Sequence, residues 1–340
     1  MTETKSTPEQ KAWYYYDWAN SAYVTTTAAV LFSPYLTSVA EKAACGFASD
    51  DDVTCRVDLQ VLGIGISPGS LVFYLVPIIT VLSAIILPIV GAMADRSSNK
   101  PLFMAWFAWI GSIAASCMVF VGGSSWQLGA FLLLIANLCL GASLVIYDAI
   151  LVEIAGPDDR DRISSRGWAL GYLGGGLLLS TNFLILTFND SLGISTSTAV
   201  RICLLGAGIW WGAFTFIPLR GLVARPPRDV VVSSGDTLLS RSFGQLWATL
   251  KDLKNFPQTL TFLLAYLFYN DGIQTVIYAA SIYGEKQLKF EKSTVLIAFL
   301  AVQFVGIVGA LVFGRVAIRI GTRKTIMMTL YIWGVVVVGG

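Results

Sequence analysis

The sequence of 340 residues contains no histidine. Histidine is the usual proton carrier near neutral pH and the commonest metal ligand, so its absence leaves any proton transfer to carboxylates. Charged residues are also scarce, at 13% of the chain against about 25% in soluble domains. The net charge of +2 gives no support for nucleic-acid binding. The hydrophobic share of 55% instead predicts an all-α integral membrane protein.

Long apolar runs cover most of the chain, and a helix that spans a bilayer needs about 20 such residues. On this criterion we predict nine membrane-spanning helices. Their residues are 17–40, 67–91, 102–121, 127–150, 167–188, 200–219, 259–283, 294–313 and 325 to the end. A polar stretch over 220–257 separates the sixth helix from the seventh. Of the 23 Lys and Arg residues, 17 fall on one side of this arrangement. The positive-inside rule therefore places the N-terminus and the 220–257 linker in the cytoplasm.

A charged segment between two apolar runs occurs twice, at Gly91–Lys100 and again from Gly314 to Lys324. The copies share a leading glycine and two basic positions, which pair Arg96 with Arg319 and Lys100 with Arg323. They differ where Ile318 replaces Asp95 and where Gly321 replaces Ser98. A repeated hairpin in a membrane chain is typical of a transporter built from duplicated helix bundles.

This duplication predicts three parts: a six-helix half at 1–219, a cytoplasmic linker at 220–257, and a partial second half at 258–340. The chain stops at Gly340, inside its ninth predicted helix. Three more helices would complete a second six-helix half. We therefore expect a truncated second half rather than a genuine nine-helix protein.

Four stretches carry a family resemblance. Gly91–Lys100 resembles the signature between helices 2 and 3 of the major facilitator superfamily, with Ser98 and Asn99 departing from it. The other three are Trp13–Tyr23, Ser165–Leu177 and Tyr269–Ile277. Together they resemble the bacterial branch of the vacuole-effluxer family, whose fungal relatives export amino acids from the vacuole during autophagy. The resemblance implies a major facilitator fold in the bacterial inner membrane, a small-molecule substrate, a lipid bilayer as surroundings and a monomer.

The resemblance also implies a conformational latch on the cytoplasmic side, in which Asp95 and Arg96 make charge contacts with neighbouring helices. A plainer interpretation is that the basic residues only satisfy the positive-inside rule. The second copy has lost its acid to Ile318. The complete set expected at the latch is Gly91, Asp95, Arg96, Lys100, Gly314, Arg319, Gly321 and Arg323.

Polar residues in helices 1 and 7 form a second repeated pattern. Asp17 and Asn20 are three residues apart, so they share a helix face, and Asp271 and Gln274 repeat this spacing. Two such faces predict a central cavity lined by both halves. For Asp17 an open alternative is a role as the helix N-cap. Asp271 lies within an apolar run, where a charge costs about 2.5–3.5 kcal/mol, so a functional position facing the bundle interior is favoured.

Three further features remain open. Asp148 lies near the end of helix 4 and either titrates or pairs with an arginine; with Asn270, it completes the candidate pathway residues. Cys45 and Cys55 share an extracytoplasmic loop, in a compartment that permits a disulfide between them. The glycines around Gly174 predict either close helix packing or a flexible gate, with packing favoured.

The sequence thus predicts a transporter that moves a small polar solute by alternating access. Amino-acid efflux coupled to protons is the expected activity, with Asp17, Asp148 or Asp271 as the proton carrier. The alternative is a non-transporting membrane sensor or scaffold on a degenerate transporter fold. No nucleophile–base pair and no set of metal ligands is evident, so we expect neither an enzyme, a metal nor a cofactor.

Overall fold

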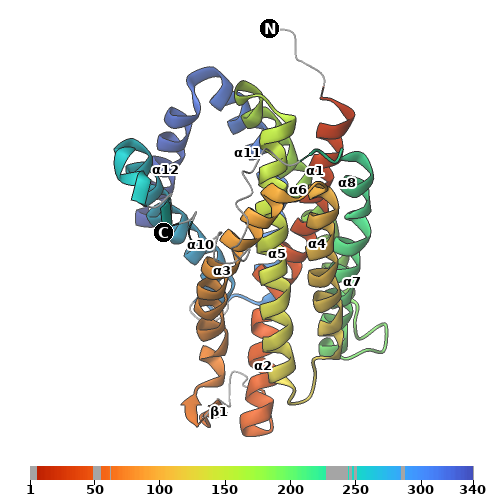
Figure 1. Ribbon diagram of the computed structural model, residues 1–340. Coiled ribbons are helices and arrows are strands. Elements are labelled where there is room, and N and C mark those ends of the chain that lie inside the picture. The colour runs from red at the N-terminus through yellow and green to blue at the C-terminus, as the bar shows by residue number, and fades with distance from the viewer. Residues whose placement is uncertain are drawn as a thin grey trace.

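The computed structural model describes residues 6–48, 55–61, 63–226, 244, 247–248, 251–284 and 288–339. Nearly all of this part is helical, and the chain traces a bundle of long helices (Figure 1). The prediction of an all-α membrane fold is therefore confirmed. Most of the linker predicted at 220–257 lies outside the described residues.

The first long helix is continuous from Pro8 to Cys45 but has three parts. They are α1 (Pro8–Tyr23), a π-helical segment η1 (Val24–Leu31) and α2 (Phe32–Cys45). Thr7 begins it with a capping box, because its hydroxyl accepts from the Gln10 backbone N–H while the Gln10 side chain accepts from the Thr7 backbone N–H. Asp17 consequently lies in the third turn, so the N-cap alternative for this residue is wrong.

The remaining helices follow the predicted order, and most of them are longer than predicted. In the first half they are α3 (Leu71–Arg96), α4 (Lys100–Cys117), α5 (Trp126–Ile154), α6 (Arg160–Thr187), α7 (Thr196–Phe214) and α8 (Phe216–Gly221). In the second half they are α10 (Pro257–Ile282), α11 (Lys292–Ile320) and α12 (Thr322–Gly339). Short 3-10 turns join several of them: η2 (Pro68–Ser70), η3 (Met118–Phe120), η4 (Pro157–Asp159) and η5 (Leu253–Asn255).

Six helical stretches among the described residues are long and apolar enough to cross a membrane by themselves. They are Pro68–Arg96, Lys100–Phe120, Trp126–Ile154, Pro157–Thr187, Thr196–Gly221 and Ser293–Ile320. The first long helix is divided by its π segment, although the whole of it is long enough to span a bilayer.

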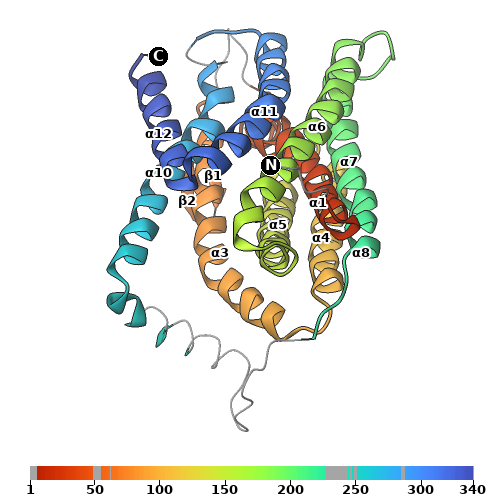
Figure 2. The same cartoon turned by 90° about the horizontal axis from the view of Figure 1, so that it is seen from above.

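The hydrophobic core lies in the first half. Helix α5 packs against α3 and α4, and α1 packs against α6 and α7. Large buried side chains such as Trp13, Tyr16 and Trp211 fill the space between these helices. Figure 2 shows α11 beside α6, which is the main contact between the two halves. By contrast, α10 and α12 lie on the outer side of α11, and most of their side chains are exposed.

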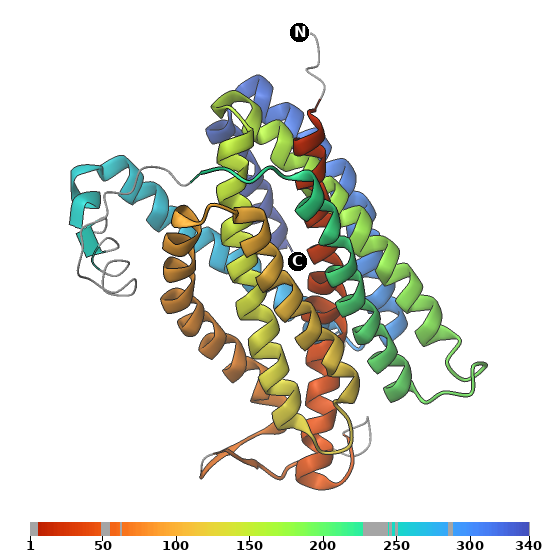
Figure 3. The ribbon, with the colours of Figure 1, turned by 45° about the vertical axis from the view of Figure 1, so that its right-hand side comes forward.

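The only strands in the described residues form a small antiparallel hairpin, β1 (Leu59–Val61) with β2 (Ile64–Ile66). It follows α2, at the end of the bundle opposite the start of α1 (Figure 3). A disulfide joins Cys45, the last residue of α2, to Cys55, with 5.9 Å between the two Cα atoms. The cysteine pair that the sequence left open is therefore bonded in this structure, where it ties the hairpin segment to the end of α2.

Candidate solute pathway and helix seam

Asp17 is the buried carboxylate at the centre of the candidate pathway. It is 8% exposed, and the Tyr147 hydroxyl on α5 donates a hydrogen bond of 2.6 Å to its Oδ2. Trp13 holds Tyr147 in place by stacking at 4.0 Å between ring centroids and by donating its indole N–H to the Tyr147 carbonyl. A buried hydrogen bond is costly to break, so this contact fixes the position of the Asp17 carboxyl group.

Asn20 lies one turn beyond Asp17 and is 4% exposed. Its amide donates to the Tyr16 carbonyl at 2.7 Å, and the Tyr16 hydroxyl donates to Ser143 Oγ on α5 at 2.5 Å. Polar groups of α1 and α5 therefore meet along a buried line. The predicted face of Asp17 and Asn20 points into the bundle, as expected for a polar face that lines a pathway.

The second predicted polar face is placed differently. Asp271 and Gln274 are exposed on α10, and Asn270 is partly exposed. The main contacts of α10 are with η1 and with η5, the turn just before it. Within the described residues, no hydrogen bond or ion pair joins the Asp271 side chain to the first half. The expected burial of Asp271 against other helices is thus absent here, because few elements pack around α10. Asp148 is likewise exposed, next to Tyr147 in α5.

The first charged hairpin is shorter than the sequence suggested. Helix α3 continues through Arg96 and α4 begins at Lys100, so only residues 97–99 connect them and the predicted charged loop is mostly helix. Lys100 is the centre of the ion pairing, with its Nζ 2.5 Å from Glu153 Oε1 on α5 and 3.7 Å from Asp95 Oδ1. Asp95 is 69% exposed, whereas Glu153 is 14% exposed. The close ion pair therefore joins α4 to α5, and Glu153 takes the place expected for Asp95.

This pair can be tested by a double-mutant cycle. Lys100→Met and Glu153→Gln are each expected to destabilise the protein by about 1–3 kcal/mol, because each leaves a mostly buried charge without its partner. The double variant should cost less than the sum of the two, with a coupling of about 0.5–3 kcal/mol. Thermal unfolding in detergent measures all four proteins. Strict additivity would show that the contact contributes nothing, and Asp95→Asn is the exposed control.

The second hairpin contacts the start of α6. Gly321, with φ of +91°, ends α11 in a backbone conformation that favours glycine, and α12 starts at the next residue. The Thr322 hydroxyl donates a 2.5 Å hydrogen bond to Asp161 Oδ2 on α6. Gly314 lies against Ser165, leaving no room for a side chain there. Of the expected latch residues, Gly314 is thus part of the seam between α6 and α11, Gly321 is an exposed residue between α11 and α12, and Arg319 lies in the last turn of α11.

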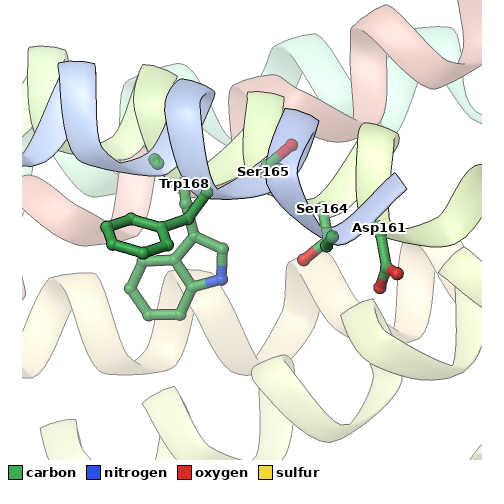
Figure 4. Close-up of a pocket in the computed structure, with 8 residues that line it drawn as sticks. Asp161, Ser164, Ser165 and Trp168 are labelled. Carbon is green, nitrogen blue, oxygen red and sulfur yellow. The ribbon is translucent and has the colours of Figure 1, made fainter. Parts of the chain in front are cut away.

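A shallow pocket of about 230 Å³ lies in this seam (Figure 4). Its walls come from one face of each helix: Asp161, Ser164, Ser165 and Trp168 on α6, and Ala310, Phe313, Gly314 and Ala317 on α11. The acidic end lies next to the second hairpin and the aromatic end lies farther along the helices. Neither Asp161 nor Trp168 is among the site residues predicted from the sequence.

Sequence reasoning also missed Tyr147, Glu153 and Gln303. Tyr147 and Glu153 flank Asp148 in α5, in a helix end with an unusual number of polar groups, and this signal was available. Gln303 is a single amide within an apolar run of α11 and is 8% exposed. A lone buried amide in a membrane helix is a signal of the same kind as a lone carboxylate.

These observations define the class of the protein. A bundle of long apolar helices, a repeated charged hairpin at helix ends and a buried carboxylate between helices are those of a multi-pass membrane transporter fold. A sequence model of the vacuole effluxer Atg22-like family matches residues 5–340. The chain therefore belongs to this family, and the resemblance inferred from the sequence is confirmed.

Two curated relatives illustrate the range of the family. An uncharacterized MFS-type transporter, YxiO of Bacillus subtilis, is 26% identical over 98% of this chain and 73% of its own length. Autophagy-related protein 22-2 of Aspergillus oryzae is 24% identical over 88% of this chain and 61% of its own length. The chain thus spans about three fifths of this fungal relative. These similarities support membrane transport as the general function.

Proposed function

We propose that this protein is a secondary transporter that exports a small polar solute, an amino acid, by alternating access driven by a proton gradient. The observation that carries the proposal is the buried Asp17, held by Tyr147 between α1 and α5. A carboxylate inside a membrane protein is costly, and such groups commonly belong to proton or substrate pathways. Without histidine in the chain, a carboxylate is the natural proton carrier.

Alternating access requires two halves that move against each other, and the seam between α6 and α11 is their main contact here. We assign residues 1–219 and 258–340 to these halves, with 220–257 as the connecting linker. Asp17 and Asn20 belong to the pathway on the first half, and Asp271 with Gln274 to the matching face on the second. The distribution of Lys and Arg supports a cytoplasmic N-terminus and linker in a bacterial inner membrane.

The proposal is tested with the full-length protein in proteoliposomes loaded with a mixture of amino acids. Efflux is followed with and without an imposed pH gradient, and protein-free liposomes give the background. We expect at least one amino acid to leave faster when the gradient is present. If all amino acids stay at background, the proposed substrate class is wrong, and a panel of other small polar solutes then tests transport itself.

A further inference from the structure

Three elements from both halves meet at Gly175 in the middle of α6. A Cβ atom placed on this glycine would lie 2.7 Å from Thr25 Oγ1 of η1 and 3.4 Å from Gln303 Oε1 of α11. The next residue, Gly176, lies against the Gln303 side chain, since its Cβ would be 3.2 Å from Gln303 Cβ. Only glycine leaves space for both polar groups beside α6. The Thr25 hydroxyl and the Gln303 amide therefore approach the same place from opposite halves of the protein.

Neither of these two polar groups has a partner in the described part of the chain. Gln303 is 8% exposed and Thr25 is 6% exposed, yet no hydrogen bond joins either side chain to another described residue. The neighbouring Thr26, by contrast, accepts a hydrogen bond of 2.9 Å from the Asn182 amide. The polar atoms of Thr25 and Gln303 are not among the fully enclosed, unpaired atoms of the described residues, so they keep some exposed surface. Packing alone does not call for polar side chains here, because apolar side chains of similar size would fill the same space.

The backbone at Thr25 is also unusual. Thr25 lies in the π-helical segment η1, where hydrogen bonds skip one residue more than in an α-helix. Such segments are rare and occur frequently at functional sites. The same segment packs against α6, α7 and α10, so it is in contact with both halves.

We propose that the Gln303 amide and the Thr25 hydroxyl are solute-binding groups, which together hold an uncharged hydrogen-bonding group of the transported molecule. The inference rests on the proposed transport function and adds a solute-binding group that the second half of the protein contributes. Both side chains donate and accept hydrogen bonds, and neither carries a charge, so they suit an amide, a hydroxyl or a similar neutral group. In the present conformation α11 closes against α6. When the two halves separate, both groups become accessible to the solute at the same level along the helices.

A ligand that bridges Thr25 and Gln303 binds one conformation better than the other. Binding energy then favours the state in which both groups face the solute, as a population shift requires. This distinguishes the pair from Asp17, which contacts only elements of the first half in the described structure. Asp17 would carry the proton, and the Thr25–Gln303 pair would sense the solute.

The test compares wild type with Gln303→Leu and Thr25→Val, which keep the approximate volume but remove hydrogen bonding. Thr80→Val is the matched control, since the Thr80 hydroxyl only bonds to the Val76 carbonyl of its own helix on an exposed face. We expect each pathway variant to raise the KM for efflux about tenfold with little change in maximal rate. The double variant should fall short of the product of the two effects, because both groups hold one ligand group. A lower rate at unchanged KM would overturn the proposal.

A second readout separates this inference from the proposed function. Thermal stabilisation of the purified full-length protein by amino acids and uncharged polar solutes measures binding without transport. If wild type is stabilised and Gln303→Leu is not, the binding site stands even when no efflux is seen. If both proteins are stabilised equally, or if wild type is stabilised by no member of the panel, the assignment of Gln303 is wrong. Equal unfolding temperatures of the two proteins without solute check that the variant is folded.

Discussion

Replacing Asp17 with asparagine is expected to abolish efflux driven by a proton gradient while leaving solute exchange between the two sides intact. Asparagine has nearly the shape of a protonated aspartate but cannot release a proton. A transporter that needs to lose a proton during its cycle therefore stops, whereas exchange can proceed with the carrier permanently in its protonated form. Gradient-driven efflux and exchange of labelled solute are measured on the same proteoliposomes. A misfolded variant would lose both, so the difference between them is diagnostic.

Two further variants test the role of Asp17. Tyr147→Phe removes the hydrogen bond of 2.6 Å to Asp17 but keeps the carboxylate, and we expect a partial loss of gradient-driven efflux of about tenfold. Asp190→Asn is the control, because Asp190 is an exposed acid in the turn between α6 and α7. Its efflux should match wild type. Full gradient-driven efflux in Asp17→Asn would contradict a role for this carboxylate and would favour Asp271 or Asp148 as the carrier.

The helical order and the membrane class could be predicted from the sequence because apolar runs of about 20 residues have few alternatives in a bilayer. The helix ends could not be predicted in this way. An apolar run shows which residues lie in the hydrocarbon layer, and a helix can extend beyond that layer. The first helix begins at Pro8, nine residues before the predicted start at 17. Its capping box of Thr7 and Gln10 was present in the sequence. The π segment η1 had no comparable signal, because it depends on packing against neighbouring helices.

The candidate site was predictable for Asp17 and Asn20, whose spacing defines one helix face. Their partner Tyr147 was not, because contacts between α1 and α5 depend on how the helices pack. For the same reason the sequence placed the charge contacts of the first hairpin on Asp95, whereas the closer ion pair joins Glu153 to Lys100. Equal positions in the two hairpins need not make equal contacts. The hairpins pack against different helices, so their contacts differ.

Glycines in α6 let this helix pack closely against the first helix, and the second large predicted effect is the loss of stability when one of them is replaced. Gly167, Gly171 and Gly175 are four residues apart, and they face Asp17, Ser21 and Thr25, which have the same spacing on the first helix. Polar side chains of one helix thus lie against the bare backbone of the other. Close helix packing is what the sequence favoured for these glycines over a flexible gate, and small residues are typical of such contacts in membranes. Gly174 belongs to the same contact, since a Cβ there would lie 2.7 Å from the Trp18 carbonyl oxygen.

Gly174→Ala and Gly206→Ala are therefore expected to change stability in opposite directions. At Gly174 the obstacle is backbone, which cannot rotate away, so α1 must shift and the protein should lose about 1–3 kcal/mol. At Gly206 in α7 nothing lies within 4 Å of an added Cβ, and alanine should stabilise the helix by about 0.5–1 kcal/mol. Thermal unfolding of the two variants in detergent measures the difference. If Gly174→Ala unfolds at the same temperature as wild type or above it, α1 has room to move away from α6. That result would contradict close packing and favour the interpretation of these glycines as a flexible gate.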